Sequence, residues 1–428
     1  MKTIKICSVL LLVMLMISPD TNAQDKSPVM ASAVAVTPAA ATPQDGTIVL
    51  KEETAEEEKP FTLTGSIDTY FHSAFGTTNP YMGGASGPST AFADLPGFGL
   101  GMANLVAAYS GERAGFTADL VFGPRGKAAV FASASGQSII NQMFAWYKLS
   151  DKVTLNLGQF NTFLGYEVIS PTVNFHYSTS YMFSWGPFSH TGLRADFDLG
   201  NGMVAKLAIM NPTDLVEFNP INTYTLGGQI GHAGDAGGVW LNVLYGDQDG
   251  KFEADDFAYE IDSNGNVVLD ENGSPVFATS SGSLFQVDLT TGWSFGEKFY
   301  LGLNTSLQSV ASGEVFISEG NVGDAGGKAS AFAGIAVYPK VTLSETFSIG
   351  FRAEYLSVTN GHLGIFTTDA DDKGSVMEFT LSGNYKVGGL TFIPEFRIDQ
   401  TSEDSFLNVD GKATNTMPSL SLAAVYKF

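Results

Sequence analysis

The chain alternates apolar and polar side chains along the stretch Phe61-Thr62-Leu63-Thr64-Gly65-Ser66-Ile67-Asp68-Thr69-Tyr70-Phe71. Successive side chains of a β-strand point to opposite faces of the sheet, so residues two apart share a face. One face of this stretch carries Phe61, Leu63, Ile67 and Phe71, and the other carries Thr62, Thr64, Ser66 and Asp68. The stretch therefore predicts a strand with one apolar and one hydrated face.

The same period of two recurs from this stretch to the C-terminus. In one later copy, Arg352 and Glu354 alternate with the apolar series Phe347, Ile349, Phe351, Ala353 and Tyr355. The whole pattern predicts about sixteen strands, with boundaries good to a few residues. The predicted spans are 61–75, 99–110, 114–123, 138–149, 153–161, 190–199, 203–210, 223–231, 238–246, 282–295, 299–309, 329–338, 346–357, 374–386, 389–399 and 418–428.

Tight turns alternate with long segments between the predicted strands. The tight turns include 150–152, 200–202, 296–298 and 387–389, and the long segments lie near 76–98, 124–137, 162–189, 211–222, 247–281, 310–328, 358–373 and 400–417. Barrels of the bacterial outer membrane pair short periplasmic turns with long external loops in this way. We therefore predict an all-β fold, a transmembrane antiparallel up-and-down β-barrel. Its even strand number would place both ends of the chain on the periplasmic side.

A sheet can cross a bilayer only if it closes on itself, because backbone amides in hydrocarbon find no water to bond. The apolar faces of the predicted strands would then contact lipid, and the polar faces would line the lumen. The residues predicted to line the pore are Asp68, Asp119, Lys148, Arg194, Asp196, Lys206, Asp288, Arg352, Glu354, Glu378, Glu395 and Arg397. Acidic members outnumber basic ones, so we expect a mild cation preference, the alternative being a mixed-charge wall without selectivity.

Aromatic residues gather near the ends of the predicted strands, where amphipathic rings suit the boundary between lipid and water. The pairs are Phe71 and Phe75, Trp146 and Tyr147, Phe299 and Tyr300, and Tyr426 and Phe428. The alternative is ordinary packing in a sheet core, since strands favour aromatic residues in general.

The N-terminus predicts export. Residues 1–23 have the three-part pattern of a secretory signal, with Lys2 and Lys5 before an apolar run and small residues before a cleavage point. The run is much shorter than the roughly 20 residues of a spanning helix, which disfavours an uncleaved anchor. Residues 24–60 are rich in Ala and Pro and then acidic, so we predict a disordered periplasmic linker, with a short helix as the alternative. The barrel would span 61–428, in the outer membrane of a Gram-negative cell.

Several chemistries find no support in the sequence. The single cysteine, Cys7, lies inside the predicted signal, so disulfides and thiolate sites are excluded from the mature chain. The formal net charge of −22 argues against nucleic-acid binding. Residues 262–266 resemble a calcium loop only superficially, because Val267 stands where the sharp turn needs Gly. We expect no enzyme, no cofactor and no metal, the alternative being a catalytic site assembled from distant residues such as His190 and a loop Ser.

The C-terminal strand introduces a resemblance. The chain ends Leu420-Ser421-Leu422-Ala423-Ala424-Val425-Tyr426-Lys427-Phe428, and such a terminal Phe resembles the signal by which the barrel-assembly machinery inserts outer-membrane barrels. A more specific likeness lies in Gly158-Gln159-Phe160-Asn161, Gly165-Tyr166-Glu167, Asn174-Phe175-His176-Tyr177-Ser178 and Phe188-Ser189-His190-Thr191-Gly192-Leu193-Arg194. With the flanking strands, these stretches resemble the OmpL-like putative β-barrel porin family over roughly 61–428. The resemblance implies a porin barrel and leaves the solute open.

The third long segment, Thr162 to Ser189, is unusually aromatic for a loop. By analogy with general porins, we hypothesise that it folds into the barrel and narrows the pore. The residues expected at this constriction are Tyr166, Glu167, Asn174, His176 and Tyr177. The alternative is a loop packed on its neighbours above the rim of the barrel.

The leading hypothesis is a passive or weakly selective porin for small hydrophilic solutes. Its partners would be these solutes, outer-membrane lipid and lipopolysaccharide, the barrel-assembly machinery through Phe428, and further copies of the chain in a homo-oligomer. The rival hypothesis is a surface adhesin, an interaction protein with an occluded barrel whose long loops bind a host or matrix partner. Liposome swelling with small sugars separates the two, since a plugged barrel would give none.

Overall fold

The computed structural model describes residues 60–79, 88–131, 139–219, 223–248, 269, 273–274, 283–311, 316–318, 321–323 and 329–428. The predicted signal peptide, the predicted linker up to residue 59 and the predicted turn at 262–266 lie outside these residues.

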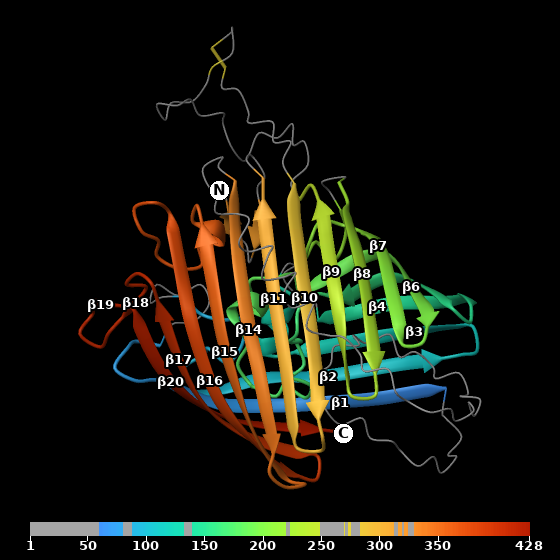
Figure 1. The fold of residues 1–428 in the computed structure, drawn as a ribbon, viewed down its shortest axis with the longest axis horizontal. Coiled ribbons are helices and arrows are strands. Elements are labelled where there is room, and N and C mark those ends of the chain that lie inside the picture. The colour runs from blue at the N-terminus through green and yellow to red at the C-terminus, as the bar shows by residue number, and fades with distance from the viewer. Residues whose placement is uncertain are drawn as a thin grey trace, which may run out of the picture. The chain divides into compact units, whose positions relative to one another are not determined.

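Sixteen strands form a closed antiparallel barrel, each pairing with its neighbours in chain order. The strands are β1 (Phe61–Ala74), β2 (Gly97–Ser110), β3 (Ala114–Phe122), β4 (Ile140–Ser150), β5 (Val153–Asn161), β6 (Ser189–Gly200), β7 (Met203–Met210), β8 (Thr225–Gly234), β9 (Gly237–Gly246), β10 (Leu284–Phe295), β11 (Phe299–Val310), β14 (Ser330–Thr342), β15 (Phe347–Thr359), β16 (Lys373–Val387), β17 (Leu390–Thr401) and β20 (Thr416–Lys427). Figure 1 shows β10 to β17 crossing in front of β1 to β3, as the tilted strands of a closed barrel do. The predicted barrel is confirmed.

Pairing between the last strand and the first closes the barrel. The ladder between β1 and β20 runs from Ser66 opposite Lys427 to Ala74 opposite Ser419. Beyond it, the backbone groups of Gly65 and Phe428 exchange two hydrogen bonds of 3.0 Å. A closed ladder leaves no row of unpaired amides, which is the condition for crossing a bilayer with strands.

Short turns and long segments occupy opposite ends of the barrel, because all neighbouring strands are antiparallel. The turn between β6 and β7 uses Gly200, Asn201 and Gly202, with φ of 83°, 53° and 76°. Such left-handed conformations cost little for Gly and are tolerated by Asn, which explains this tripeptide at a tight hairpin. The predicted alternation of tight turns with long segments is confirmed.

One predicted strand is too short. We expected 329–338, and β14 continues to Thr342. Pro339 interrupts the sequence pattern because it lacks the N–H that a ladder needs. In the structure Pro339 lies opposite Leu301 of β11, while the ladder to β15 passes from Val337 directly to Lys340. The strand therefore tolerates the proline by losing pairing on one side only.

Apolar side chains cover the outer face of the barrel, and polar side chains cover the inner face. Leu157, Leu207 and Leu381 are 64%, 62% and 50% exposed, whereas Arg352 and Glu378 are fully buried. Water-soluble proteins show the opposite distribution, and a large exposed apolar surface marks a contact with a partner or a membrane. The barrel thus has the faces that a lipid environment requires.

The aromatic residues near strand ends divide between the two faces. Tyr147 and Phe299 are exposed on the outside, but Trp146 and Tyr300 are buried within the barrel. The expectation that all of these rings lie at the lipid boundary is therefore wrong for Trp146 and Tyr300. Adjacent residues of a strand point to opposite faces, so only one member of each neighbouring pair can face lipid.

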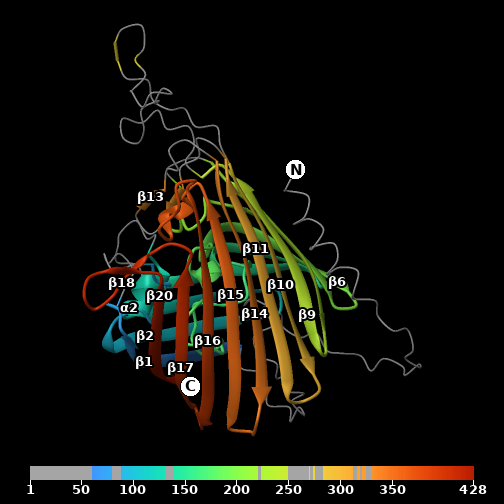
Figure 2. The same ribbon diagram turned by 60° about the vertical axis from the view of Figure 1, so that its left-hand side comes forward.

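Smaller elements lie in the long segments. They are α2 (Pro124–Ala129), α3 (Tyr181–Ser184), the 3-10 turn η1 (His362–Gly364), and the hairpins β12 (Phe316–Ser318) with β13 (Asn321–Gly323) and β18 (Phe406–Leu407) with β19 (Ala413–Thr414). The helix α2 packs against β2 and β3, and Figure 2 shows it next to β2. Within the described ranges, no helix is both long and apolar enough to cross a membrane.

Candidate functional site

The segment 162–188 between β5 and β6, here named the inner loop, lies inside the barrel. Three contacts with distant strands define its path. The backbone N–H of Gly165 donates to Asp288 of β10 at 3.0 Å. His176 Nδ1 forms a 2.7 Å hydrogen bond with Ser382 Oγ of β16, and the Tyr177 hydroxyl donates to Asp68 of β1 at 2.6 Å. The inner loop therefore crosses the interior of the barrel, and Figure 1 shows this green segment between the front and back walls.

Two wall carboxylates each bind two successive amides of the inner loop. Glu395 on β17 accepts the backbone N–H groups of residues 177 and 178 at 2.9 and 3.2 Å. Glu354 on β15 accepts those of residues 181 and 182, both at 2.7 Å. Both carboxylates are buried, and a buried charge is tolerated when several donors satisfy it. Together the two glutamates fix the stretch 177–182 against the wall.

Arg352, in the middle of β15, connects the inner loop to the wall by charge pairing. Its Nη1 donates to Glu167 of the loop at 2.6 Å and to the carbonyl oxygen of Ser178 at 2.8 Å. Its Nε and Nη2 donate to Glu378 of β16 at 2.9 and 3.1 Å. All three charged side chains are buried. Glu167, which was expected at the constriction, thus has its charge paired with that of Arg352.

Two further arginines bind carbonyl oxygens of the inner loop. Arg397 on β17 pairs with Asp399 at 2.7 Å and donates to the carbonyl oxygen of Thr179 at 2.8 Å. Arg125 in α2 donates to the carbonyl oxygen of Tyr177 at 3.2 Å. The stretch 177–182 thus has amides held by carboxylates and carbonyl oxygens held by guanidinium groups.

Glycines in the wall make room for aromatic side chains of the inner loop. A Cβ on Gly302 of β11 would lie 2.5 Å from the ring of Tyr166, and one on Gly350 of β15 would lie 2.3 Å from the ring of Phe175. Carbon atoms do not approach so closely, so any larger residue would displace these rings. The two glycines, here named the glycine sockets, therefore leave the room that these rings fill and so set the distance between the inner loop and the wall.

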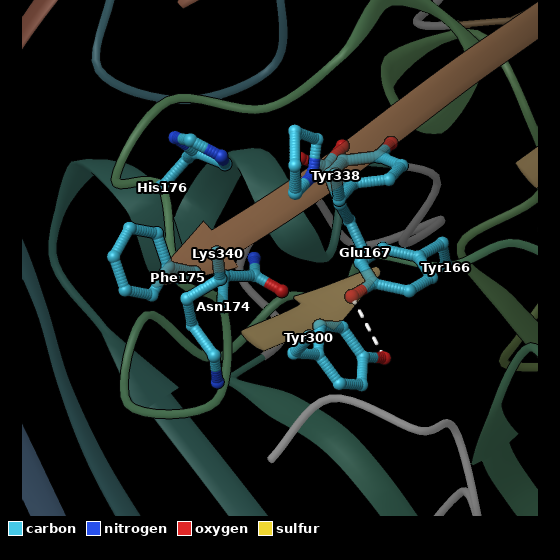
Figure 3. Close-up of a pocket in the computed structure, with 9 residues that line it drawn as sticks. Tyr166, Glu167, Asn174, Phe175, His176, Tyr300, Tyr338 and Lys340 are labelled. Carbon is cyan, nitrogen blue, oxygen red and sulfur yellow. Dashed lines mark hydrogen bonds between the residues drawn. The ribbon is translucent and has the colours of Figure 1, made fainter. Parts of the chain in front are cut away.

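Tyr166 lies among aromatic residues of the wall, as Figure 3 shows. Its ring stacks on Tyr338 of β14 with centroids 4.1 Å apart, and its hydroxyl lies 3.0 Å from that of Tyr300 of β11. Lys340 Nζ lies 5.0 Å from the centroid of the Tyr300 ring, a cation–π distance. Burial holds the pKa of Tyr166 well above its usual value, so its hydroxyl stays a neutral hydrogen-bonding group.

The remaining predicted constriction residue, Asn174, supports the loop from within. Its side chain donates to the carbonyl oxygen of Val168 at 2.6 Å and accepts the N–H of Val168 at 2.9 Å. Burial and the nearby Arg352 guanidinium lower the pKa of His176 well below its usual value, so this imidazole is neutral. Tyr166, Glu167, Asn174, His176 and Tyr177 all lie inside the barrel, and each has a hydrogen-bond partner.

The predicted pore-lining residues fall into two groups. Those that contact the inner loop are Asp68, Asp288, Arg352, Glu354, Glu395 and Arg397, with Glu378 joined through Arg352. The second group, which contacts other residues of the wall, is Asp119, Lys148, Arg194, Asp196 and Lys206. Arg194 pairs with Asp196 at 2.9 Å.

The other members of the second group show the same pattern. Asp119 accepts from the amides of Asn141 and Gln142 at 2.7 and 3.1 Å. Lys206 donates to Gln229 at 2.6 Å. Lys148 Nζ lies 5.6 Å from the centroid of a tryptophan ring on its own strand. The wall is therefore largely satisfied by its own hydrogen bonds, with amides placed beside most of its carboxylates.

Among the residues of the site that the sequence prediction did not name are Arg125, Asp399 and Asp214. Asp399 follows Arg397 by two residues, so the period of two already placed both on one face. Arg125 follows Pro124, a common first residue of a helix, but nothing in the sequence indicated that this helix meets the inner loop. Asp214 accepts the backbone N–H groups of residues 188 and 189, both at 2.8 Å, where the inner loop ends. Burial raises the pKa of Asp214 to about 7.

Comparisons with known proteins agree with the barrel fold. The family described as "Putative beta-barrel porin-2, OmpL-like" matches residues 60–428. The chain is similar in structure to the outer membrane channel DcaP of Acinetobacter baumannii, with a TM-score of 0.53, 12% sequence identity, and coverage of 86% of this chain and 97% of that one. It is also similar to an anion-selective porin from Comamonas acidovorans, with a TM-score of 0.51, 10% sequence identity, and coverage of 86% of this chain and 99% of that one. For OmpT of Vibrio cholerae the TM-score is 0.50 and the sequence identity 11%, with coverage of 86% of this chain and 97% of that one. At such identities the likeness concerns the fold alone, and no curated protein matches the sequence significantly.

Proposed function

The chain belongs to the OmpL-like putative beta-barrel porin-2 family, and from that premise we propose that it is an outer-membrane porin through which small hydrophilic solutes diffuse. The observation that carries the proposal is a closed barrel with an apolar outer face and a hydrogen-bonding inner face, crossed by an inner loop. An apolar exterior suits lipid, and a polar interior can replace the water around a passing solute.

We propose that the inner loop forms the constriction of this channel. Its anchors lie on β1, β10 and β15 to β17, so the loop removes cross-section from the lumen over that part of the wall. Deleting residues 168–182 should raise single-channel conductance in planar bilayers and speed the swelling of liposomes in small sugars. Deleting 409–411, at the exposed tip of the β18–β19 hairpin, is the matched control. Unchanged conductance after the first deletion would refute the constricting role.

A weak cation preference is part of the proposal. Around the inner loop, the carboxylates Asp68, Glu167, Glu354, Glu378, Glu395 and Asp399 outnumber the guanidinium groups of Arg125, Arg352 and Arg397. Each of these six carboxylates accepts a hydrogen bond from the protein, so the preference should be small. The reversal potential under a salt gradient measures it, and anion selectivity would contradict this part of the proposal alone.

One observation favours the rival function, a surface adhesin with an occluded barrel. Phe163 and Leu164 of the inner loop belong to an apolar cluster that includes the wall residues Met210, Leu244 and Leu284. Apolar packing across a lumen hinders water and ions. Absence of swelling and of ion current from correctly folded protein, together with binding of a matrix partner by the long loops, would establish the adhesin instead.

The family and fold support an outer-membrane location and a non-enzymatic role. We propose that the chain reaches this membrane through cleavage of the signal 1–23, that 24–60 is a periplasmic linker, and that Phe428 is read by the barrel-assembly machinery. Contacts with lipid, lipopolysaccharide and further copies of the chain belong to the same proposal. Sequencing the N-terminus of the mature protein tests the first step, and the expected first residue is near Gln24.

A further inference from the structure

Residues of the inner loop line two hollows in the barrel, one richer in hydroxyl groups and the other richer in aromatic rings. The outer hollow lies toward the long-segment end, between the loop, β1, β17 and β20. Beside the rings of Phe92 and Tyr181, hydroxyl groups from separate parts of the chain line it, namely those of Ser89, Thr90, Ser178, Ser419 and Ser421. These groups can both donate and accept hydrogen bonds, so they match a solute with many hydroxyls.

The charged groups of the outer hollow already have partners in the protein. Arg397 pairs with Asp399 at 2.7 Å. Glu395 accepts two amides of the inner loop and the hydroxyl of Ser382 at 2.8 Å. Asp94 also lines the hollow and has a partner of its own. The hydroxyl groups of Thr90 and Ser178 accept hydrogen bonds from Arg397 at 3.4 Å, and that of Ser421 bonds with His72 at 3.0 Å. Each hydroxyl has one donor and two acceptor positions, so each keeps a position for a solute. Because satisfied charges gain little from a counter-ion, these remaining positions favour an uncharged solute.

The inner hollow lies toward the short-turn end and is aromatic. Figure 3 shows the rings of Tyr166, Phe175, Tyr300 and Tyr338 around it, with Lys340 among them. Lys340 Nζ lies 5.8 and 5.0 Å from the ring centroids of Phe175 and Tyr300. The Glu167 carboxylate at this hollow is paired with Arg352. Apolar ring faces therefore dominate the surface that a solute meets.

A cyclic sugar carries hydroxyl groups around its rim and C–H groups on its faces. The outer hollow matches the rim by hydrogen bonding, and the inner hollow matches the faces by contact with aromatic rings. An ion lacks both features, and a linear polyol lacks the flat face. We propose that neutral sugars of one ring are the preferred solutes, bound weakly first on one side of the inner loop and then on the other. This inference rests on the proposed porin function.

The test uses the full-length protein in planar bilayers, with glucose as the probe and salt as the current carrier. Glucose should reduce the ion current with a midpoint in the millimolar range, and mannitol, glucuronate and glucosamine should do so less. Ser419→Ala and Phe175→Leu should each raise the glucose midpoint about 2- to 10-fold, the loss of one neutral hydrogen bond or one aromatic contact. The matched controls are Leu420→Ala, on the outward face of β20, and Val173→Ala, at an exposed loop position. Both should leave the midpoint unchanged.

The outcomes separate this inference from the proposed function. Normal ion current with no effect of glucose would overturn the sugar assignment and leave the porin proposal standing. Absence of current and of swelling from folded protein would overturn the porin proposal itself. Equal block by glucose and mannitol would show that no ring face is recognised. Glucose midpoints that Ser419→Ala and Phe175→Leu leave unchanged would show that the two hollows are not the binding sites.

Discussion

Replacing Arg352 with methionine should release the inner loop from the wall. Arg352 donates six hydrogen bonds, to Glu167, Ser178, Glu378 and Thr380. Methionine removes all of them and leaves two buried carboxylates without their main partner, a change that typically costs about 3–5 kcal/mol. Glu167 keeps the amide of Ser180 at 2.7 Å, and Glu378 keeps Arg397 at 3.8 Å. We therefore expect the lower end of the range, about 3 kcal/mol, which corresponds to about a 100-fold shift toward the released loop.

Single-channel recording measures this shift, because a released loop widens the lumen. Arg352→Met should show larger and noisier conductance steps than the wild type. Arg194→Met is the matched control, since Arg194 is also buried and pairs with Asp196 at 2.9 Å, a partner in the wall and not in the inner loop. It should leave the conductance near the wild-type value.

A folding defect must be separated from loop release. The double variant Arg352→Met/Glu167→Gln removes one of the two stranded charges, so it should regain part of the lost stability against denaturant while keeping the raised conductance. Arg352→Lys keeps a charge but loses the two-pronged pairing with Glu378, so its effect should be intermediate. If Arg352→Met folds and conducts like the wild type, the inner loop is not held by this pairing and the reasoning fails.

Three further predictions concern other parts of the barrel. Gly302→Val should displace the Tyr166 ring from the wall, lower the free energy of unfolding by about 1–3 kcal/mol and raise the conductance. Gly228→Ala is the control and should do neither, because its new Cβ would lie 3.9 Å from the nearest atom beyond its chain neighbours. Equal behaviour of the two variants would refute the role of Gly302 in making room for Tyr166. Burial lowers the pKa of His362 to about 4, below its usual 6.5. The folded state therefore favours the neutral imidazole, and this contribution to the free energy of unfolding is complete above about pH 6.5. It is lost, by up to about 3 kcal/mol, as the pH falls toward 4. Hydrogen exchange of residues 360–372 should therefore speed up at pH 4.5 beyond the intrinsic pH effect, and an equal speeding in His362→Gln would assign it to another group. Deleting Phe428 removes two backbone hydrogen bonds with Gly65, so the pairing of β20 with β1 should lose about 1–3 kcal/mol and membrane insertion should slow. Phe428→Tyr is the control and should keep the two hydrogen bonds and the insertion rate. Unimpaired assembly of the truncated chain would count against this role of Phe428.

The period of two was sufficient to predict which face of each strand is polar. It placed Asp68, Arg352 and Glu395 on inward positions, and the structure has all three there. For a neighbouring pair of aromatic residues, the pattern shows which ring faces lipid only when the alternation is followed residue by residue from the rest of the strand. We expected both rings of each pair to face lipid, which explains the errors at Trp146 and Tyr300. The predicted end of β14 was wrong because Pro339 lacks an N–H, which we took as the end of the strand. Pro339 leaves a gap in the ladder to β15 but not in the ladder to β11.

The sequence by itself determined a closed, even-numbered barrel with an apolar exterior, because strand alternation and turn length are local properties that every strand repeats. Only the tertiary structure decided which charges meet. Arg352 and Glu167 are separated by 185 positions in the chain, and their pairing depends on where the inner loop enters the lumen and on how far the glycine sockets let it approach. Such distances follow from the closure and tilt of the whole sheet, and no local pattern encodes them.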